Sequence, residues 1–178
     1  MHQWTLPELG PGTVRPVVTA PDPVLSTRCR EVSPQDPATV SLAADLMATM
    51  RVSPGCVGLA ANQIGVGARV FCVDVTGHPK TRICHGAFVL VNPRLVSASR
   101  KERAREGCMS VPDFTGDVRR ATRVVMAGYL PGTSQEVQIT TDAFEARALQ
   151  HELDHIAGML FLDRVAGAHA IHPRQTYQ

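Results

Sequence analysis

The stretch DAFEARALQHELDHIAG occupies residues 142–158 and predicts a helix with a metal-binding pattern inside it. Asp142 is a good helix N-cap, and Glu145 three residues later completes a pattern that resembles a capping box. Gly158 suits a helix end, because glycine adopts left-handed backbone angles without strain. The stretch therefore predicts a helix from about residue 143 to residue 157.

Four residues of this helix are expected on one face, since Phe144, Ala148, His151 and His155 follow one another at spacings of four, three and four. The two histidines form the ends of an HExxH pattern, in which both imidazoles can bind one metal ion. Glu152 lies one step around the helix, where it can act as a general base on a water at the metal. The alternative is a solvated helix in which the pattern arose by chance.

The rest of the chain predicts one more helix and a set of strands. Apolar residues recur at helical spacing over about residues 38–51 and form a single stripe that ends before Pro54. Strand-like runs, rich in β-branched and apolar residues, cover residues 70–75, 88–91, 95–99, 118–129 and 136–141. The last two runs flank Pro131-Gly132 and are expected to form a hairpin. The sequence therefore predicts an α+β fold, with antiparallel strands packed around a late helix that carries HExxH, plus an N-terminal helix.

Length and composition favour a single globular domain over residues 1–178. Hydrophobic residues make up 44% of the chain and charged residues 19%, which excludes disorder along its whole length. Residues 1–15 contain prolines and glycines with little periodicity and predict a loose arm, and residues 166–178 predict a flexible tail.

Charge and cysteine usage bear on partners and compartment. Lys and Arg number 18 and Asp and Glu number 16, so the net charge of +2 is too small to indicate a nucleic acid or an anionic membrane as partner. The five cysteines are odd in number and include no CxxC pair, which suits a reducing compartment. The N-terminus does not resemble a secretory signal, and no apolar run has the length of a membrane span. We therefore expect a soluble protein of the cytoplasm.

A catalytic metal site needs a third ligand, and Cys108 in the segment EGCMS (residues 106–110) is the best candidate. A thiolate would favour a soft to borderline metal, but the same residue could be a small buried thiol, and the local sequence does not decide between the two. Cys84 and His85 are neighbours in a strand-like region, where adjacent side chains point to opposite faces, so they are not expected to share an ion. Three cysteines are expected as small buried hydrophobic residues: Cys29, Cys56 and Cys72.

The segment GLAANQIG (residues 58–65) is the third stretch of interest. Its glycines and alanines allow a backbone to approach a ligand closely, and the amide N–H of Gln63 could stabilise an oxyanion. Taken alone, the segment is more typical of a loop packed under the first helix.

These three segments together, in this order, resemble the peptide deformylase family. The family has a glycine-alanine segment ending in Gln, here residues 58–63, an EGC(L/M)S segment, here residues 106–110, and a QHExDH segment, here residues 150–155. The resemblance runs from about residue 22 to residue 163. It implies a metallohydrolase that removes the formyl group from N-formylmethionyl peptides and nascent chains, including chains at the ribosome, and that releases formate.

The resemblance also implies roles for the site residues. Cys108, His151 and His155 would bind one divalent metal ion, Fe²⁺ in bacterial cells, with Zn²⁺, Ni²⁺ or Co²⁺ as substitutes. Glu152 would take a proton from a water in the open position and pass one to the leaving amine.

The remaining implied roles concern the substrate. Gln63 and the backbone N–H of Met109 would hold the oxyanion, and Gly58 would contact the peptide through its backbone. Ala148 is a small residue on the face that carries the histidines. We hypothesise that it leaves space for the methionine side chain of the substrate. Two departures from the family pattern are Cys56, which stands where a glycine is common, and the pair Thr115-Gly116, where some members have a basic peptide-binding residue.

Three other interpretations stay open. An HExxH peptidase acting on internal peptide bonds would not need Cys108. A deformylase-like binding protein would keep the metal but do no chemistry. A structural zinc module is disfavoured, since only three good ligands are visible and Glu152 would have no role in it.

Overall fold

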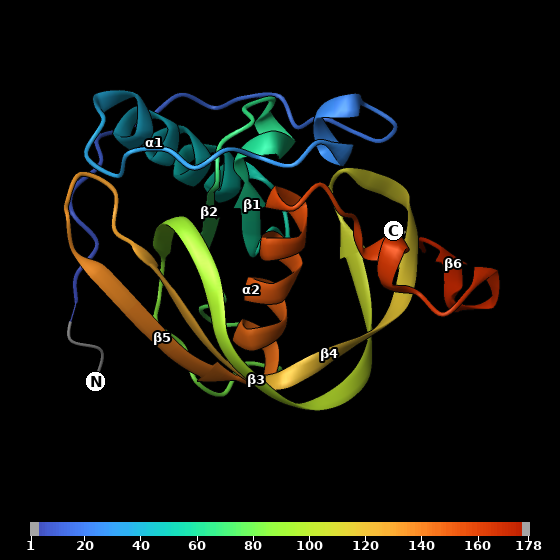
Figure 1. The fold of residues 1–178 in the computed structure, drawn as a ribbon. Helices are drawn as coiled ribbons and strands as arrows, with labels where there is room; N and C mark the ends of the chain where they lie inside the picture. The colour runs from blue at the N-terminus through green and yellow to red at the C-terminus, as the bar shows by residue number, and fades with distance from the viewer. Residues whose placement is uncertain (1–3, 176–178) are drawn as a thin grey trace.

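A six-stranded antiparallel sheet and two helices form the fold in the computed structural model, which describes residues 4–175 (Figure 1). The sheet order is β1-β2-β3-β4-β5, and β6 pairs with β4. The strands are β1 (Gly58–Ala60), β2 (Val70–Val73), β3 (Phe88–Cys108), β4 (Val111–Tyr129), β5 (Glu136–Asp142) and β6 (Ile171–Pro173). The helices are α1 (Pro37–Val52) and α2 (Ala143–Ile156), with 3-10 turns at Pro23–Ser26, Ala61–Ile64, Phe161–Arg164 and Ala168–Ala170. The predicted α+β class is confirmed.

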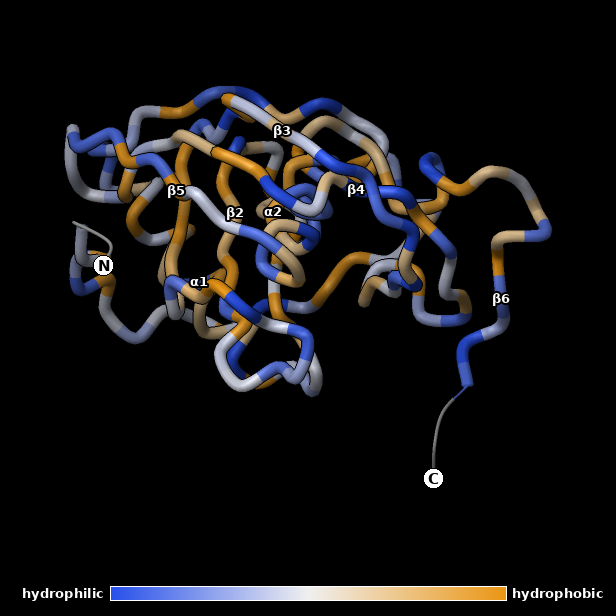
Figure 2. The backbone as a smooth tube through the Cα atoms, turned by 90° about the horizontal axis from the view of Figure 1, so that it is seen from below, coloured by the Kyte–Doolittle hydropathy of each residue, from blue (hydrophilic) through white to orange (hydrophobic). Residues whose placement is uncertain are grey.

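Helix α2 lies in the middle of the molecule, with strands on several sides of it (Figure 1). Its fully buried Leu149 and Ile156 belong to one apolar cluster with Phe71 and Met126 of the sheet. Helix α1 instead packs on β1 and β2, where its apolar stripe meets a second cluster. In Figure 2, β2 is largely orange, whereas much of β3 is blue or white. Burial of its apolar side chains therefore holds α2 in place, and this fixes the positions of the two histidines on it.

The hairpin of β3 and β4 is the longest element, and the sequence predicted only parts of it. The middle of β3 is exposed and charged, so it lacks the alternation that marks a half-buried strand. The register shifts between Val91 and Arg94, close to the positive φ of 49° at Asn92, so the two predicted runs belong to one bent strand. A second shift between Gly107 and Cys108 precedes the pair of Cys108 with Val111, which closes the hairpin.

Both predicted helices are confirmed to within a residue or two, but the predicted capping box of α2 is wrong. Asp142 occupies the N-cap position and makes no capping hydrogen bond with its side chain. Its Oδ1 accepts from the backbone N–H of Ile83 at 3.3 Å, and the Glu145 carboxylate accepts from the N–H of His85 at 2.8 Å. The two carboxylates anchor a loop rather than the helix start.

Residues 4–15, for which the sequence predicts a loose arm, have no regular secondary structure, and several of them contact the rest of the fold. Trp4 is only 8% exposed and joins the main core. The N–H of Thr13 donates to Oδ1 of Asp45 in α1 at 2.7 Å, and Nε of Arg15 donates to Oδ2 at 3.0 Å. The buried Asp45 carboxylate therefore fixes the arm along α1. Residues 1–3 lie outside the described part of the chain.

The sequence predicts a flexible tail over residues 166–178, of which the structure describes residues 166–175. This segment forms a 3-10 turn and then β6, which pairs with residues 114–116 of β4. The N–H of Arg174 donates to the carbonyl oxygen of Asp113 at 2.9 Å, so the contact continues past the strand. Residues 176–178 lie outside the described residues. Within residues 4–175, neither helix has the length and apolar character needed to cross a membrane.

Candidate metal centre

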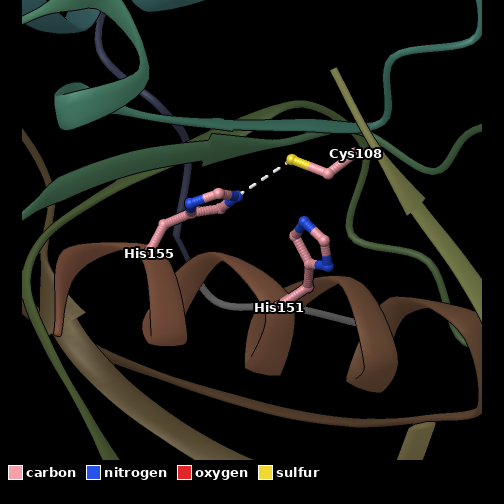
Figure 3. A group of neighbouring side chains, drawn as sticks. All are labelled: Cys108, His151 and His155. Atoms are coloured by element: carbon pink, nitrogen blue, oxygen red, sulfur yellow. Dashed lines mark hydrogen bonds between the residues drawn. The ribbon is translucent and has the colours of Figure 1, made fainter. Parts of the chain in front are cut away.

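Cys108, His151 and His155 converge at the end of β3 beside α2 (Figure 3). One potential ligand atom from each residue lies within 4.8 Å of the others, and Sγ of Cys108 is 3.2 Å from Nε2 of His155. The two histidines meet because positions four apart on a helix lie one above the other. The cysteine joins them because the register shift at the end of β3 turns the strand into the Met109-Ser110 turn.

A buried carboxylate orients the first histidine. Nδ1 of His151 lies 2.9 Å from Oε1 of Glu106, which leaves Nε2 for a metal ion. A carboxylate behind a ligating histidine is a common arrangement, because it fixes the ring and raises its basicity. Burial raises the pKa of Glu106, but the hydrogen bonds from His151 and Arg120 outweigh burial and bring its pKa well below the usual range.

Arg120 joins that carboxylate to a second acid on α2. Its Nε and Nη2 donate to both oxygens of Glu106 at 2.9 and 3.0 Å, and its Nη1 donates to Oδ2 of Asp154 at 2.5 Å. Arg147 and Arg164 donate to the same two carboxylates from the periphery. The network satisfies both buried acids and ties β3, β4 and α2 together behind the metal ligands.

Sequence reasoning missed the network of Glu106, Arg120 and Asp154. Two signals were present: Glu106 is the first residue of the EGCMS segment, and Asp154 is the x before the second histidine of HExxH. Arg120 is only 4% exposed, yet nothing in its surroundings distinguishes it from the other arginines of the hairpin.

Glu152 is a buried carboxylate that adjoins His151, one of the three candidate ligands. It is 3% exposed, and among the described residues its Oε2 has no hydrogen-bond partner. Burial raises its pKa to about 7, partly offset by the charge of His151. Gly58 makes room for it, since a Cβ at that position would lie 2.8 Å from Oε1 of Glu152. A carboxylate with a pKa near neutrality suits a group that accepts and returns a proton.

Gln63 is held with its amide nitrogen toward Cys108. Its Oε1 accepts from the N–H of Ala60 at 3.0 Å, while Nε2 donates to Oγ of Ser110 at 3.1 Å and lies 3.5 Å from Sγ of Cys108. The amide is therefore an oriented donor beside the site.

A cavity of about 340 Å³ connects most of the predicted site residues. The predicted residues that line it are Gly58, Gln63, Cys108, Met109, Ala148, His151 and Glu152. His155 is 1% exposed and lies beneath this lining. The structure thus brings the three sequence segments to one place.

Of the other four cysteines, one, Cys56, lines the cavity beside the three candidate ligands, and the other three do not line it. His85 contacts Glu145 through Nδ1 at 2.5 Å, and Cys84 is exposed, so this pair is not part of the cluster, as predicted. Cys29 and Cys72 are buried as predicted. Cys56 is only half-buried and lines the cavity, which corrects the expectation for it; burial raises the pKa of its thiol to about 12.

The donor set fits a divalent ion. Burial, followed by the charges of His151 and Arg120, lowers the pKa of His155, so its imidazole stays neutral as a ligand must. For His151, burial lowers the pKa, but Cys108 and Glu106 outweigh it and raise the pKa, so a metal ion that binds Nε2 must displace a proton from this ring. One sulfur and two imidazole nitrogens with a cavity on the open side match a three-ligand catalytic centre.

Comparison with known proteins gives one family. The model of the polypeptide deformylase family matches residues 14–170. A peptide deformylase of Desulforudis audaxviator is 44% identical over 151 residues, which cover 83% of this chain and 91% of the relative. Peptide deformylase 2 of Streptomyces coelicolor is 40% identical over 168 residues, which cover 94% of this chain and 90% of the relative.

Solved structures agree. The crystal structure of peptide deformylase from Ehrlichia chaffeensis superposes with a TM-score of 0.79 at 33% identity, covering 86% of this chain and 89% of that one. A class I type b peptide deformylase from Acinetobacter baumannii, solved with Met-Ala-Ser bound, superposes with a TM-score of 0.77 at 33% sequence identity. The match covers 86% of this chain and 100% of that one. The chain belongs to the peptide deformylase family, and it is a metal-dependent hydrolase that removes the N-formyl group from the N-formylmethionyl ends of newly made proteins and releases formate.

Proposed function

We propose that Cys108, His151 and His155 hold the divalent ion of this deformylase. The observation that carries the proposal is that three donors of suitable chemistry lie within 4.8 Å of one another on the cavity side of α2. When bound, the ion would supply Lewis acidity, which polarises a carbonyl and lowers the pKa of a water. We further propose Fe²⁺ as the ion in the cell, with Zn²⁺, Ni²⁺ or Co²⁺ as substitutes. The softness of the thiolate supports a borderline metal, and supply decides among such metals more than affinity does.

Glu152 is the proton carrier of the proposed reaction. Its carboxylate is buried, has a pKa raised to about 7 and packs directly against Gly58. It accepts a proton from the attacking water and then delivers one to the amine nitrogen as the bond to the formyl carbon breaks. The products are formate and a free amino terminus.

Gln63 and Met109 hold the formyl oxygen as it gains negative charge. The amide nitrogen of Gln63 is already oriented by Ala60 and Ser110, which lowers the cost of donating to the oxyanion. The backbone N–H of Met109 is the second donor, at the turn that follows Cys108.

The substrate peptide occupies the rest of the cavity. Gly58 contacts its main chain, and the small side chain of Ala148, which is 5% exposed, leaves room for an unbranched methionine side chain. The relative from Acinetobacter baumannii bound to Met-Ala-Ser supports a peptide beginning with methionine as the product. Nascent chains at the ribosome are the proposed source of substrate, the cytoplasm is the proposed compartment, and residues 1–178 are the proposed extent of one deformylase-like domain.

Metal content and turnover of single variants test these roles together. Replacing Cys108, His151 or His155 by alanine should remove both the ion and formate release. Glu152→Gln should keep one ion per chain and lose turnover, because it removes the proton carrier and no ligand. A Glu152→Gln variant with wild-type turnover would refute the role of Glu152 as proton carrier. A Cys108→Ala variant that keeps its ion would refute the ligand assignment and favour an HExxH peptidase, for which unformylated peptides are the next substrates.

A further inference from the structure

Arg174 reaches the cavity of the metal centre from the C-terminal segment. Strand β6 pairs with residues 114–116 of β4, and the N–H of Arg174 continues this contact by donating to the carbonyl of Asp113 at 2.9 Å. Nη2 of Arg174 donates to the carbonyl oxygen of Cys108 at 3.2 Å. The guanidinium therefore contacts the main chain of a proposed metal ligand and lines the same cavity.

Most of the donors on this guanidinium are left without protein acceptors. Arginine carries five N–H donors and keeps its charge at all physiological pH values. Among the described residues, the buried Nε of Arg174 has no hydrogen-bond partner. The one protein acceptor found for this guanidinium in the described part of the chain is the carbonyl of Cys108, so N–H donors on its terminal nitrogens remain for a ligand in the cavity that Arg174 lines.

The nearby carboxylates are already neutralised by other cations. Asp117 pairs with Arg103, Arg105 and His172. Glu106 is held by Arg120, as described above. Neither acid forms an ion pair with Arg174 within the described residues, so Arg174 brings net positive charge to the cavity.

The chain leaves space for this arginine at Gly107. A Cβ on Gly107 would lie 2.6 Å from Nη2 of Arg174, so a larger residue would displace the guanidinium. Thr115, which also lines the cavity, carries no charge and sits at the position where the sequence lacks an expected basic residue. Arg105 and Arg147 also line the cavity, but Arg105 pairs with Asp117 and Arg147 pairs with Glu106. Among the described residues, Arg174 is therefore the cavity arginine that forms no ion pair with a carboxylate.

We propose that Arg174 binds a main-chain carbonyl of the substrate peptide, one of those that follow the formylated nitrogen. This inference rests on the proposed function of the site. A methionine side chain offers the guanidinium no strong acceptor, whereas every peptide unit that leaves the cavity carries a carbonyl oxygen. A charged donor to such an oxygen makes a stronger hydrogen bond than a neutral donor.

The test compares a substrate that has main-chain carbonyls after the methionine with one that has none. The first is formyl-Met-Ala-Ser amide, whose amidated end carries no carboxylate that could pair with the guanidinium. The other is N-formyl-3-(methylthio)propylamine, which keeps the formyl group and the methionine side chain but has no carbonyl after them. The metal-loaded variants are Arg174→Met and Arg174→Lys. Arg94→Met is the matched control, since Arg94 is an exposed arginine of β3 that pairs with Glu136 and lies outside this cavity.

We expect Arg174→Met to raise KM for the tripeptide roughly tenfold or more, with kcat changed less than twofold. Its kcat/KM for the truncated amine should equal that of the wild type. Arg174→Lys keeps the charge without the planar fork and should give an intermediate KM for the tripeptide only. Arg94→Met should behave as wild type with both substrates.

Two results would overturn the inference. An unchanged KM for the tripeptide would show that the guanidinium binds no carbonyl. An equal loss on both substrates, with a loss of metal, would show that Arg174 only holds the Cys108 turn in place. If Arg174→Met does not fold, Arg174→Lys decides by the same comparison. Wild-type protein that releases no formate from either substrate would refute the proposed function itself, whereas failure of the Arg174 assignment alone leaves wild-type turnover intact.

Discussion

Oε1 of Glu106 lies 2.9 Å from Nδ1 of His151, and both oxygens of the same carboxylate accept from Arg120. The histidine is therefore fixed by a carboxylate that is itself fixed from behind. Together with the contact of Arg120 with Asp154, this relationship links the end of β3, the middle of β4 and helix α2.

Glu106→Gln should weaken metal binding about 10- to 100-fold, because the neutral amide orients His151 less firmly and no longer raises its basicity. Competition with a chelator of known affinity measures the change. Glu102→Gln is the matched control, since Glu102 is exposed on the same strand. Equal metal affinity for wild type and Glu106→Gln would contradict the role given to this carboxylate.

Glu152 should make the metal-free protein less stable as pH rises. Its folded pKa of about 7 exceeds its ordinary value of 4.5, so the folded state binds more protons between these values and stability falls through that window. The difference corresponds to about 3 kcal/mol when fully developed. Glu152→Gln lacks this penalty, so its melting temperature should exceed that of the wild type at pH 8 by more than at pH 5. Parallel pH profiles of the two metal-free proteins would show that burial of Glu152 carries no such cost.

Gly58→Ala should lower kcat at least tenfold while metal content stays the same. The added Cβ would lie 2.8 Å from Oε1 of Glu152, so the carboxylate must move, and small displacements of a reacting group are costly in rate. Gly67→Ala is the control, since no atom lies within 4 Å of its Cβ position and its φ is not positive. A wild-type kcat for both variants would contradict the role given to Gly58.

Ala148→Trp should cripple turnover of formyl-Met peptides by filling the space assigned to the methionine side chain. Ala157→Trp, on the exposed C-terminal end of α2, should keep wild-type kinetics. Steady-state kinetics with metal content measured in parallel would distinguish a blocked pocket from a damaged metal site. Unchanged kinetics for Ala148→Trp would remove this residue from the pocket.

Removing the ion should lower the melting temperature, because a ligand that binds only the folded state stabilises it. Adding back a single divalent ion to the chelated protein should restore the melting temperature, and the same addition to Cys108→Ala should restore little. Thermal unfolding monitored with and without the ion provides the measurement. If chelation left the melting temperature of the wild type unchanged, the ligand assignment would have to be revised.

The helix that carries the histidines and the hairpin around residues 131–132 could be predicted from the sequence, because these features are local and periodic. The carboxylate–arginine network could not be predicted, since Glu106 and Arg120 are 14 residues apart and Arg120 and Asp154 are 34 apart. Such contacts depend on how β3, β4 and α2 are stacked.

The errors of the sequence prediction have the same physical origin. Asp142 and Glu145 match a capping box locally, yet tertiary contacts with residues 83–85 occupy both carboxylates. The C-terminal segment has no periodicity, but the free edge of the β4 hairpin supplies it with a partner strand. The position of Arg174 at the cavity could not be predicted either, because Arg174 comes 66 residues after the carbonyl that it contacts.

Formate release from formyl-Met-Ala-Ser by anaerobically prepared, Fe²⁺-loaded protein tests the central claim most directly. We predict one formate for each free methionyl amine, from the wild type and not from the Glu152→Gln variant with equal metal content. A fully loaded wild-type protein that releases no formate, or a Glu152→Gln variant that releases it at the wild-type rate, would contradict the account.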